Sequence, residues 1–432
     1  MAETLFKNVM IFDGNAKRPY AGEVKLQGNL IKKVARGKGK IRANGATVVD
    51  GAGATLMPGM VEPHSHVCYI DSASLPEIGR LQPEEHMVLA LDNARTMLDA
   101  GFTSLFSAAG VGYNKLRIEP VLRDVINAGR YPGPRIKAAS PEIVSSGGLG
   151  DERMWHMHQE SVGYIADGPD EVRKACRLCV REGVDNLKIN ISGDEFAHPG
   201  QSEKITYFDA EVAAAAEVAR EAGVNIITHA RADKAVRLAL KHGINIIYHA
   251  DYATDKTLDM LEAKKKDIYM APAVGIVYTT AYEAAEWGMT REVAESYNLF
   301  YKMEHTVRTY KEVRKRGIRA MPGGDYGFAW NPIGTNARDL EHFVNMFGYS
   351  PAEALIGATK WAGELMGMNV GMVKEGYLAD LLLVDGDPTK DVSIMQDTDN
   401  LLMIMKDGAY HRAPNEIALA KRRRGEAPAA AE

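Results

Sequence analysis

Two hydrophobic patterns alternate through the middle of the chain. Short apolar runs rich in β-branched residues are separated by stretches with apolar residues three and four positions apart. The short runs predict strands at 60–67, 103–107, 136–139, 186–191, 225–229, 245–249, 268–271 and 318–323. The longer stretches predict helices that include 84–100, 209–221, 234–241, 257–264 and 291–316. Strands that alternate with helices are typical of parallel α/β folds, and eight such strands predict a (β/α)8 TIM barrel.

Both ends of the chain show strand patterns separated by turns. Near the start, Asp13-Gly14 is a turn signal, and residues 23–26 and 30–34 form a predicted hairpin. Strand patterns return after the barrel, at 376–385 and 401–408. Neither end is large enough to be stable alone, so we expect them to pair. The predicted domains are a composite β-sandwich from 1–57 and 369–412, a barrel from 58–368, and a mobile tail from 413–432.

Composition narrows the class of protein. The chain has 432 residues, more than one compact core normally holds, which fits a barrel with an accessory layer. Its net charge of -5 gives no reason to expect a nucleic-acid partner. No apolar run approaches the roughly 20 residues that span a bilayer, so we expect no membrane partner. Three cysteines and a start without a signal pattern favour a cytoplasmic location.

The candidate chemistry begins with His64 and His66 at the end of the first predicted strand. Residues two apart face the same side of a strand, so both imidazoles point to one place. In a barrel, functional groups come from the C-terminal ends of strands. Metal-competent side chains belong to four later strands: Lys188 lies within one, His229 and His249 end the next two, and Asp325 follows the last. Each alone is more often a core histidine, a snorkelling lysine or a turn aspartate, but the combination predicts a metal site.

This pattern resembles the amidohydrolase superfamily. The likeness rests on Met57-Pro58-Gly59-Met60 leading into His64-Ser65-His66, on the later Lys, His, His and Asp, and on the closing run at 376–383. Within the superfamily, the chain is similar to the imidazolonepropionase-like and prolidase-like branch, which includes phenylurea and xenobiotic amide hydrolases. One departure is Pro63, where many relatives have Asp.

The resemblance implies two divalent metal ions. His64, His66 and Asp325 would hold one ion and His229 and His249 the other, with a carbamylated Lys188 as the bridging ligand. Nitrogen and oxygen donors suit zinc best, and manganese, cobalt or iron are alternatives. The family also implies the barrel with its composite sandwich, and barrel enzymes of this type often form homo-oligomers.

The implied activity is hydrolysis of a small molecule by a metal-activated hydroxide. We expect cleavage of a non-peptide C–N bond in an amide, urea or carbamate, with Asp325 as the catalytic proton shuttle. Alternatives are a dipeptidase or N-acyl-amino-acid hydrolase, a cyclic amide or lactone hydrolase, and a non-catalytic barrel. A peptidase needs a cationic anchor such as Arg231 for the substrate carboxylate, although Arg231 can equally pair with a loop acid.

Substrate contacts are expected from the loops that follow the strands. The candidates are Tyr69, residues 145–151, Asn190, Arg231, Tyr252, Tyr278, Tyr326, Phe328 and Trp330. Their aromatic members favour an apolar or aromatic substrate. The roles of His156 and His158, which follow the third predicted strand, stay open.

Overall fold

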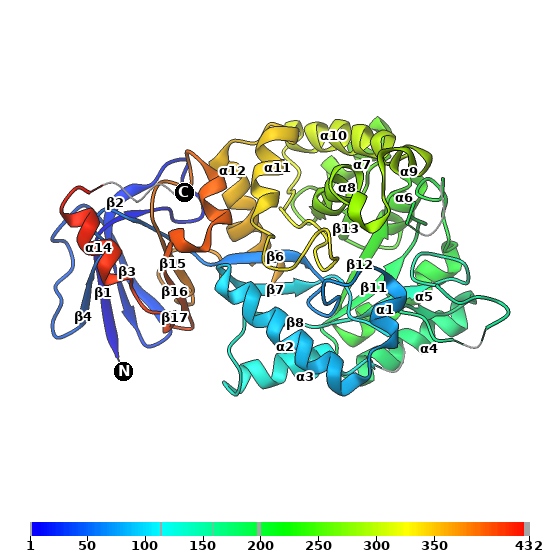
Figure 1. Cartoon of the computed structure of the whole chain (residues 1–432), viewed down its shortest axis with the longest axis horizontal. Helices are drawn as coiled ribbons and strands as arrows, with labels where there is room; N and C mark the ends of the chain where they lie inside the picture. Colours follow the sequence, from blue (N-terminus) through cyan, green and yellow to red (C-terminus); the bar gives the residue numbers. More distant parts are fainter. Residues whose placement is uncertain (1, 113–114, 158, 197–199, 427–432) are drawn as a thin grey trace.

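The computed structural model describes residues 2–112, 115–157, 159–196 and 200–426. Its centre is built from parallel strands in two sheets (Figure 1). The three-stranded sheet has the order β6 (Met60–Ser65), β7 (Phe102–Ser107), β8 (Arg135–Lys137). The six-stranded sheet has the order β10 (Tyr164–Ile165), β9 (Ala139–Val144), β11 (Asn186–Asn190), β12 (Asn225–Ala230), β13 (Ile246–His249), β14 (Tyr269–Ala271).

Single bridges extend this arrangement towards a TIM-barrel-like α/β fold. Gly110 bridges Pro141 beside the gap between the two sheets, and Ala320 bridges Met270 at the far edge. Among the described strands, however, hydrogen bonds do not close the ring. The eighth expected strand, 318–323, forms only that one bridge, because Pro322 has no N–H to donate to a ladder. The third expected strand, 136–139, is in fact two strands, β8 and β9.

Helices fill the connections between the central strands. In chain order they are α1 (Leu75–Arg80), α2 (Pro83–Asp99), α3 (Ile118–Asn127), α4 (Gly168–Arg181), α5 (Asp209–Ala222), α6 (Asp233–Lys241), α7 (Asp255–Ala263), α8 (Val274–Tyr282), α9 (Arg291–Ser296), α10 (Leu299–Lys315), α11 (Arg338–Phe347), α12 (Pro351–Ile356) and α13 (Ala362–Leu365). Short 3-10 or π turns are η2 (Ala285–Trp287), η3 (Gly357–Trp361), η4 (Val392–Gln396) and η5 (Thr398–Asn400). The single helix expected at 291–316 is two helices, because Asn298 adopts a left-handed conformation with φ 56°.

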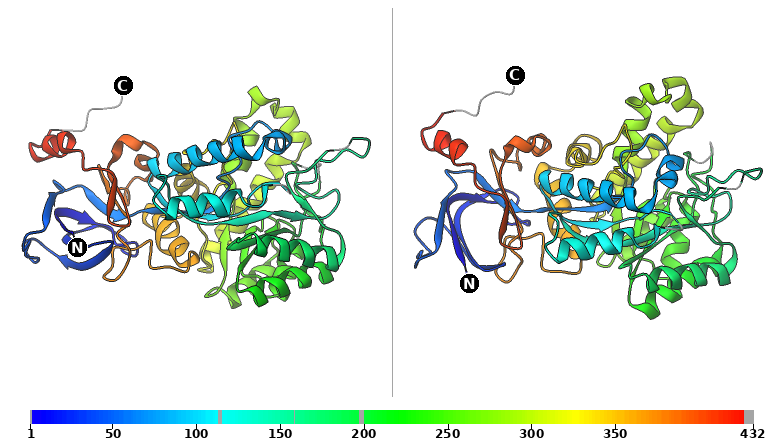
Figure 2. Two further views of the ribbon diagram at one scale, coloured as in Figure 1. Left: turned by 90° about the horizontal axis from the view of Figure 1, so that it is seen from below. Right: turned by 60° about the horizontal axis from the view of Figure 1, so that its bottom comes forward.

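The two ends of the chain meet in one eight-stranded sheet beside the parallel strands (Figures 1 and 2). Its strands are β1 (Glu3–Ile11), β2 (Tyr20–Gln27), β3 (Leu30–Arg36), β4 (Thr47–Asp50), β5 (Thr55–Pro58), β15 (Leu381–Val384), β16 (Leu401–Lys406) and β17 (Ala409–Arg412). The join is the antiparallel pair β5–β15, in which Leu56 lies opposite Leu383. Both leucines are buried in a cluster with Phe6 and Met403. The ends therefore pair as expected, but this pairing does not confirm a sandwich of two sheets.

The tail that was expected to be mobile includes a helix, α14 (Glu416–Arg423). The Asn415 side chain caps it by accepting a hydrogen bond from the Ala418 N–H at 3.1 Å. Leu419 is fully buried, and Arg422 forms an ion pair with Asp385. Residues 427–432 lie outside the described part of the chain. In that part, no helix combines the length and apolar character required to cross a membrane.

Candidate metal and substrate site

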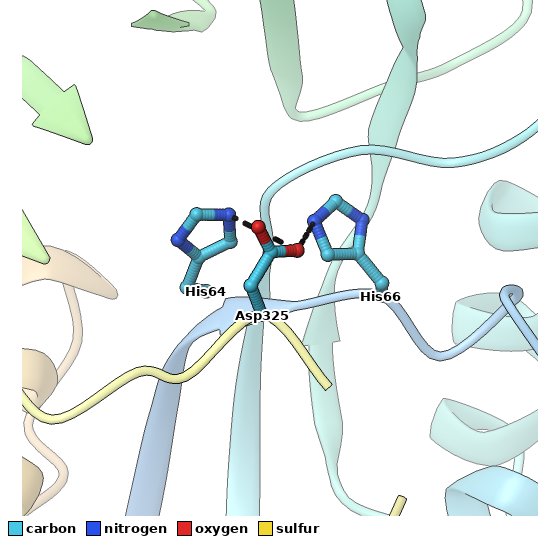
Figure 3. A group of neighbouring side chains, drawn as sticks. All are labelled: His64, His66 and Asp325. Carbon is cyan, nitrogen blue, oxygen red and sulfur yellow. Dashed lines mark ion pairs between the residues drawn. The ribbon is translucent and has the colours of Figure 1, made fainter. Parts of the chain in front are cut away.

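Strand β6 brings the first two predicted ligands together. The ligand atoms of His64, His66 and Asp325 all lie within 4.8 Å of one another (Figure 3). His66 Nε2 is 2.9 Å and His64 Nε2 is 3.8 Å from Asp325 Oδ1. The other nitrogen of His66, Nδ1, lies 3.1 Å from the Ala109 carbonyl oxygen, to which it donates. Nε2 of His66 is therefore the ring nitrogen that faces the Asp325 carboxylate.

His64 is a buried imidazole without hydrogen bonds. It is 0% exposed, and neither ring nitrogen has a hydrogen-bond partner among the described residues. Its ring stacks on Tyr248 with centroids 4.2 Å apart. Burial lowers its pKa well below the usual value, although the Asp325 charge opposes this shift, so the ring is neutral. Buried polar atoms normally have partners, and a metal ion would satisfy this ring.

Strand β13 places His249 beside His64, and strand β12 places His229 beside His249. Their ring centroids are 4.2 Å apart, and those of His64 and His249 are 5.3 Å apart. His249 Nδ1 is also buried without a partner. His229 Nε2 donates towards the Gly193 carbonyl oxygen at 3.2 Å. Burial, and then the charge of Arg231, lowers the pKa of His229 to about 3, so its ring is neutral as a metal ligand must be.

Lys188 on β11 is 1% exposed. Its Nζ lies 4.0 Å from Glu142 Oε1. Burial lowers the pKa of the Lys188 amine, while the charges of Glu142 and Asp325 oppose the shift. A lowered pKa increases the fraction of neutral amine, which is the form that captures carbon dioxide.

Two glycines, Gly323 and Gly324, directly precede Asp325 and allow it to lie close to the histidines. A methyl group added at Gly324 would overlap the Tyr326 ring and lie 2.6 Å from Asp339 Oδ1. Asp325 itself has φ 61°, a left-handed conformation that aims its carboxylate back at β6. Burial would raise the pKa of Asp325, but His64, His66 and Lys188 lower it well below its ordinary value. The carboxylate is therefore charged at neutral pH.

A cavity of about 510 Å³ opens over these residues. Five of the six predicted ligands line it: His66, Lys188, His229, His249 and Asp325. His64 is buried beside Asp325. The apolar side of the wall includes Tyr69, Leu75, Phe196, Ile276, Phe328 and Trp330. The structure thus brings together all six residues that the strand-end argument predicted.

Three of the predicted substrate residues line the cavity and two do not. Tyr69 stacks on His66 at 4.1 Å, and Trp330 donates from Nε1 to Thr280 Oγ1 at 2.9 Å. Arg231 is the third lining residue. Tyr326 and Tyr252 are not among the described lining residues. The hydroxyl of Tyr326 donates to Asp339 Oδ1 at 3.1 Å, and the ring of Tyr252 packs against His305 at a centroid distance of 5.2 Å.

The other substrate candidates are divided in the same way. Phe328 and residues 148–151 line the cavity, whereas Asn190 and Tyr278 are not among its described lining residues. Tyr278 packs on His342 with centroids 4.9 Å apart. His156 is exposed and does not line the cavity either, and His158 lies outside the described residues.

Arg231 is held in a buried network of charges. It is 1% exposed and forms ion pairs with Asp194 and, at 2.7 Å, with Asp251. Lys302 from α10 adds a 2.9 Å ion pair to Asp194. Of the two roles that the sequence left open for Arg231, the structure shows the pairing with loop acids.

Sequence reasoning missed three carboxylates of the cavity wall, Glu142, Glu152 and Asp194. Glu142 lies near the end of β9, where the strand-end rule would have found it if the third strand had not been placed at 136–139. Burial raises its pKa, while Lys188 and then His66 oppose this. Asp194 follows β11 by four residues and lies 3.5 Å from His229 Nε2. It carries no separate sequence signal.

Comparisons with known proteins agree with this geometry. The amidohydrolase family model matches residues 55–410. Ochratoxinase from Aspergillus niger is 24% identical over 341 residues, which cover 73% of this chain and 67% of the relative. A crystal structure of an amidohydrolase is 25% identical with a TM-score of 0.82, covering 95% of this chain and 99% of the other. A Xaa-Pro dipeptidase with bound methionine is 23% identical with a TM-score of 0.82, covering 95% and 100%.

The family match spans most of the chain and includes every predicted ligand. Together with the hydrolases among its relatives, this match supports hydrolysis of carbon–nitrogen bonds. The protein is a hydrolase of this kind and belongs to the amidohydrolase family.

Proposed function

We propose that the protein is a binuclear metal-dependent hydrolase that cleaves a non-peptide C–N bond in an amide, urea or carbamate. The observation that carries the proposal is the meeting of six potential ligands at one site, from strands β6, β11, β12 and β13 and from the segment that ends at Asp325: His64, His66, Lys188, His229, His249 and Asp325.

The donor set fits two divalent ions. The partnerless ring nitrogens of His64 and His249 are buried where a cation would satisfy them. His64, His66 and Asp325 would hold one ion and His229 and His249 the other, with carbamylated Lys188 as the bridge. Such nitrogen and oxygen donors favour zinc, with manganese, cobalt or iron as alternatives. When bound, the ions supply an acidified water and polarise the substrate carbonyl.

Asp325 is the residue of the chain best placed to move a proton. Its side chain is 17% exposed, lines the cavity and is charged at neutral pH. In this role it accepts a proton from the attacking water and passes it to the departing nitrogen. Tyr69, Phe328 and Trp330 hold the apolar part of the substrate beside it.

The ion pairs of Arg231 with Asp194 and Asp251 support a non-peptide substrate. A dipeptidase needs a free cation for the terminal carboxylate, but Arg231 is already neutralised by Asp194 and Asp251. Arg153, another cation of the cavity wall, pairs with Asp151 at 2.7 Å. Neither guanidinium is free to bind a carboxylate without breaking an existing pair.

A substrate panel tests the proposal. Anilides, aryl ureas, carbamates, and Xaa-Pro and Xaa-Arg dipeptides are offered to the metal-loaded and the chelator-treated protein. We expect turnover of non-peptide members by the metal-loaded protein, and its loss after chelation. Cleavage of dipeptides alone would favour the peptidase alternative, and turnover that survives complete metal removal would reject a metal-dependent reaction.

A further inference from the structure

We propose that the substrate site extends beyond the cavity onto an outer aromatic surface, formed by Trp330 and Trp287, that binds a second flat apolar group of the substrate. The substrate then carries one apolar group beside the scissile bond and an aryl ring further from it. This inference rests on the proposed function and adds a substrate class to it.

A row of aromatic rings leads from the proposed metal ligands to the surface. The Tyr69 ring stacks on His66 at a centroid distance of 4.1 Å and meets the edge of the Phe328 ring at 5.6 Å. The Phe328 centroid is 5.4 Å from that of Trp330, and the Trp330 centroid is 6.2 Å from that of Trp287. Rings at such distances are in direct contact, so the row is continuous.

The cavity reaches the surface along this row. Tyr69, Phe328 and Trp330 line the cavity, and the last two of them are partly exposed. Trp287 ends the short turn η2 and is not among the described lining residues. Its side chain is 44% exposed. A substrate group that leaves the cavity along Trp330 therefore meets the Trp287 indole next.

Hydrogen bonds hold the inner part of the outer aromatic surface in place. Trp330 Nε1 donates to Thr280 Oγ1 at 2.9 Å, and this hydroxyl donates to the Ile276 carbonyl of α8 at 2.6 Å. The turn that carries Phe328 and Trp330 is closed by the Asn331 N–H, which donates to the Phe328 carbonyl at 2.8 Å. Rings that are already ordered lose little conformational entropy when a ligand binds.

The two indoles leave room for a flat ligand group. Trp330 and Trp287 are tilted by 53°, so their faces do not cover each other. Burying an exposed indole face against another flat ring is favourable. The cavity volume of about 510 Å³ also lies in the range of sites that hold drug-sized molecules. Both observations favour a substrate with two separated apolar groups over one with a single ring.

Paired anilides test for the outer aromatic surface. In each pair, the para position of an acetanilide carries a methyl, ethyl or propyl chain, either alone or with a phenyl ring at its end. A benzanilide series places the same groups on the acyl ring. We compare kcat/KM, and binding by calorimetry, for the metal-loaded wild type, Trp287→Ala, Trp287→Phe and the control Tyr410→Ala. Tyr410 is 40% exposed on β17 of the terminal sheet.

For the wild type we expect the phenyl-ended member to have the higher kcat/KM in at least one pair. Trp287→Ala should reduce this phenyl-to-alkyl ratio by roughly two- to tenfold, the effect of losing one aromatic contact. Trp287→Phe keeps an aromatic face and should retain part of the preference, and Tyr410→Ala should leave the ratio unchanged. The ratio is taken within each enzyme, so partial loss of folded protein does not alter it.

The inference is overturned if the phenyl-ended members have no advantage in the wild type, or if Trp287→Ala keeps the full ratio. A smaller oligomer of Trp287→Ala in sedimentation, with an unchanged ratio, would assign the indole to a contact between copies of the chain instead. Turnover of the alkyl members without a phenyl preference would reject the inference and leave the proposed function standing. If no member is turned over, the proposed function fails, and the binding ratios alone decide the outer aromatic surface.

Discussion

At the residue scale, the site combines buried neutral imidazoles with a charged carboxylate. His64 and His249 have buried ring nitrogens that no described residue satisfies, while Asp325 is held as an anion beside them. Burial keeps His64, His229 and His249 unprotonated, which leaves their electron pairs available. This combination is costly in an empty protein and favourable around a cation.

Asp325→Asn tests the role of this anion. The amide keeps the size of the side chain but cannot accept a proton, so we expect kcat to fall by roughly 10²–10⁴-fold. Steady-state kinetics with the best substrate of the panel provides the measurement. Asp170→Asn, at a side chain that is 97% exposed on α4, is the matched control and should keep its rate. A normal rate in Asp325→Asn would remove it as the proton shuttle.

The meeting of the six candidate residues was predictable from sequence, because the ends of parallel strands converge on one face of such a fold. His64, His66 and Lys188 could thus be related to Asp325 before any distance was known. The directions of long side chains could not be predicted, because they depend on partners far away in the chain. Arg231 turns to Asp194 and Asp251, and Tyr326 turns to Asp339.

At the element scale, the segment before Asp325 does not form a regular strand. Its backbone packs closely against β6 instead. Gly323 lies against Pro63, Glu62 and His64, so a side chain there would push into β6. Gly324 lies against Tyr326 and Asp339 in the same way. The apolar pattern at 318–323 predicts a strand. The packing against β6 explains why Gly323 stands at the end of this run.

Gly324→Ala should therefore destabilise the protein and disturb Asp325. We expect a loss of roughly 1–3 kcal/mol in the free energy of unfolding, as for overpacking of a core. Denaturant unfolding measures it, with metal binding as a second readout. The control is Gly79→Ala in α1, where an added Cβ meets nothing within 4 Å. Equal stability of both variants would contradict the steric argument.

At the scale of the whole molecule, one buried arginine links the parallel strands to the terminal sheet. Arg135 of β8 donates to Asp380 at 2.7 Å and to Asp407 at 2.6 Å, next to β15 and β16. Asp380 is 2% exposed. The pairing of the chain ends was predictable from their strand patterns, but this link was not, because Arg135 and Asp380 are 245 positions apart. The domain boundaries, homo-oligomer and cytoplasmic location stay predictions.

Arg135→Met should leave Asp380 buried without its cation. We expect a loss of roughly 3–5 kcal/mol in unfolding free energy, as for breaking a buried ion pair. Arg173→Met is the control, since Arg173 pairs with the exposed Asp170 and Glu217 and its loss should cost only about 0–1 kcal/mol. Similar losses in thermal or denaturant unfolding of the two variants would show that the link does not stabilise the molecule.

The metal content measured during reconstitution tests the two-ion site most directly. Chelator-treated protein is titrated with zinc, and bound metal per chain is determined together with the rate of hydrolysis. We expect activity to rise until about two ions are bound, and Lys188→Ala to lose metal and activity together, while Lys234→Ala, on the exposed face of α6, behaves as wild type. Full activity without bound metal, or in Lys188→Ala with little metal, would contradict the binuclear site.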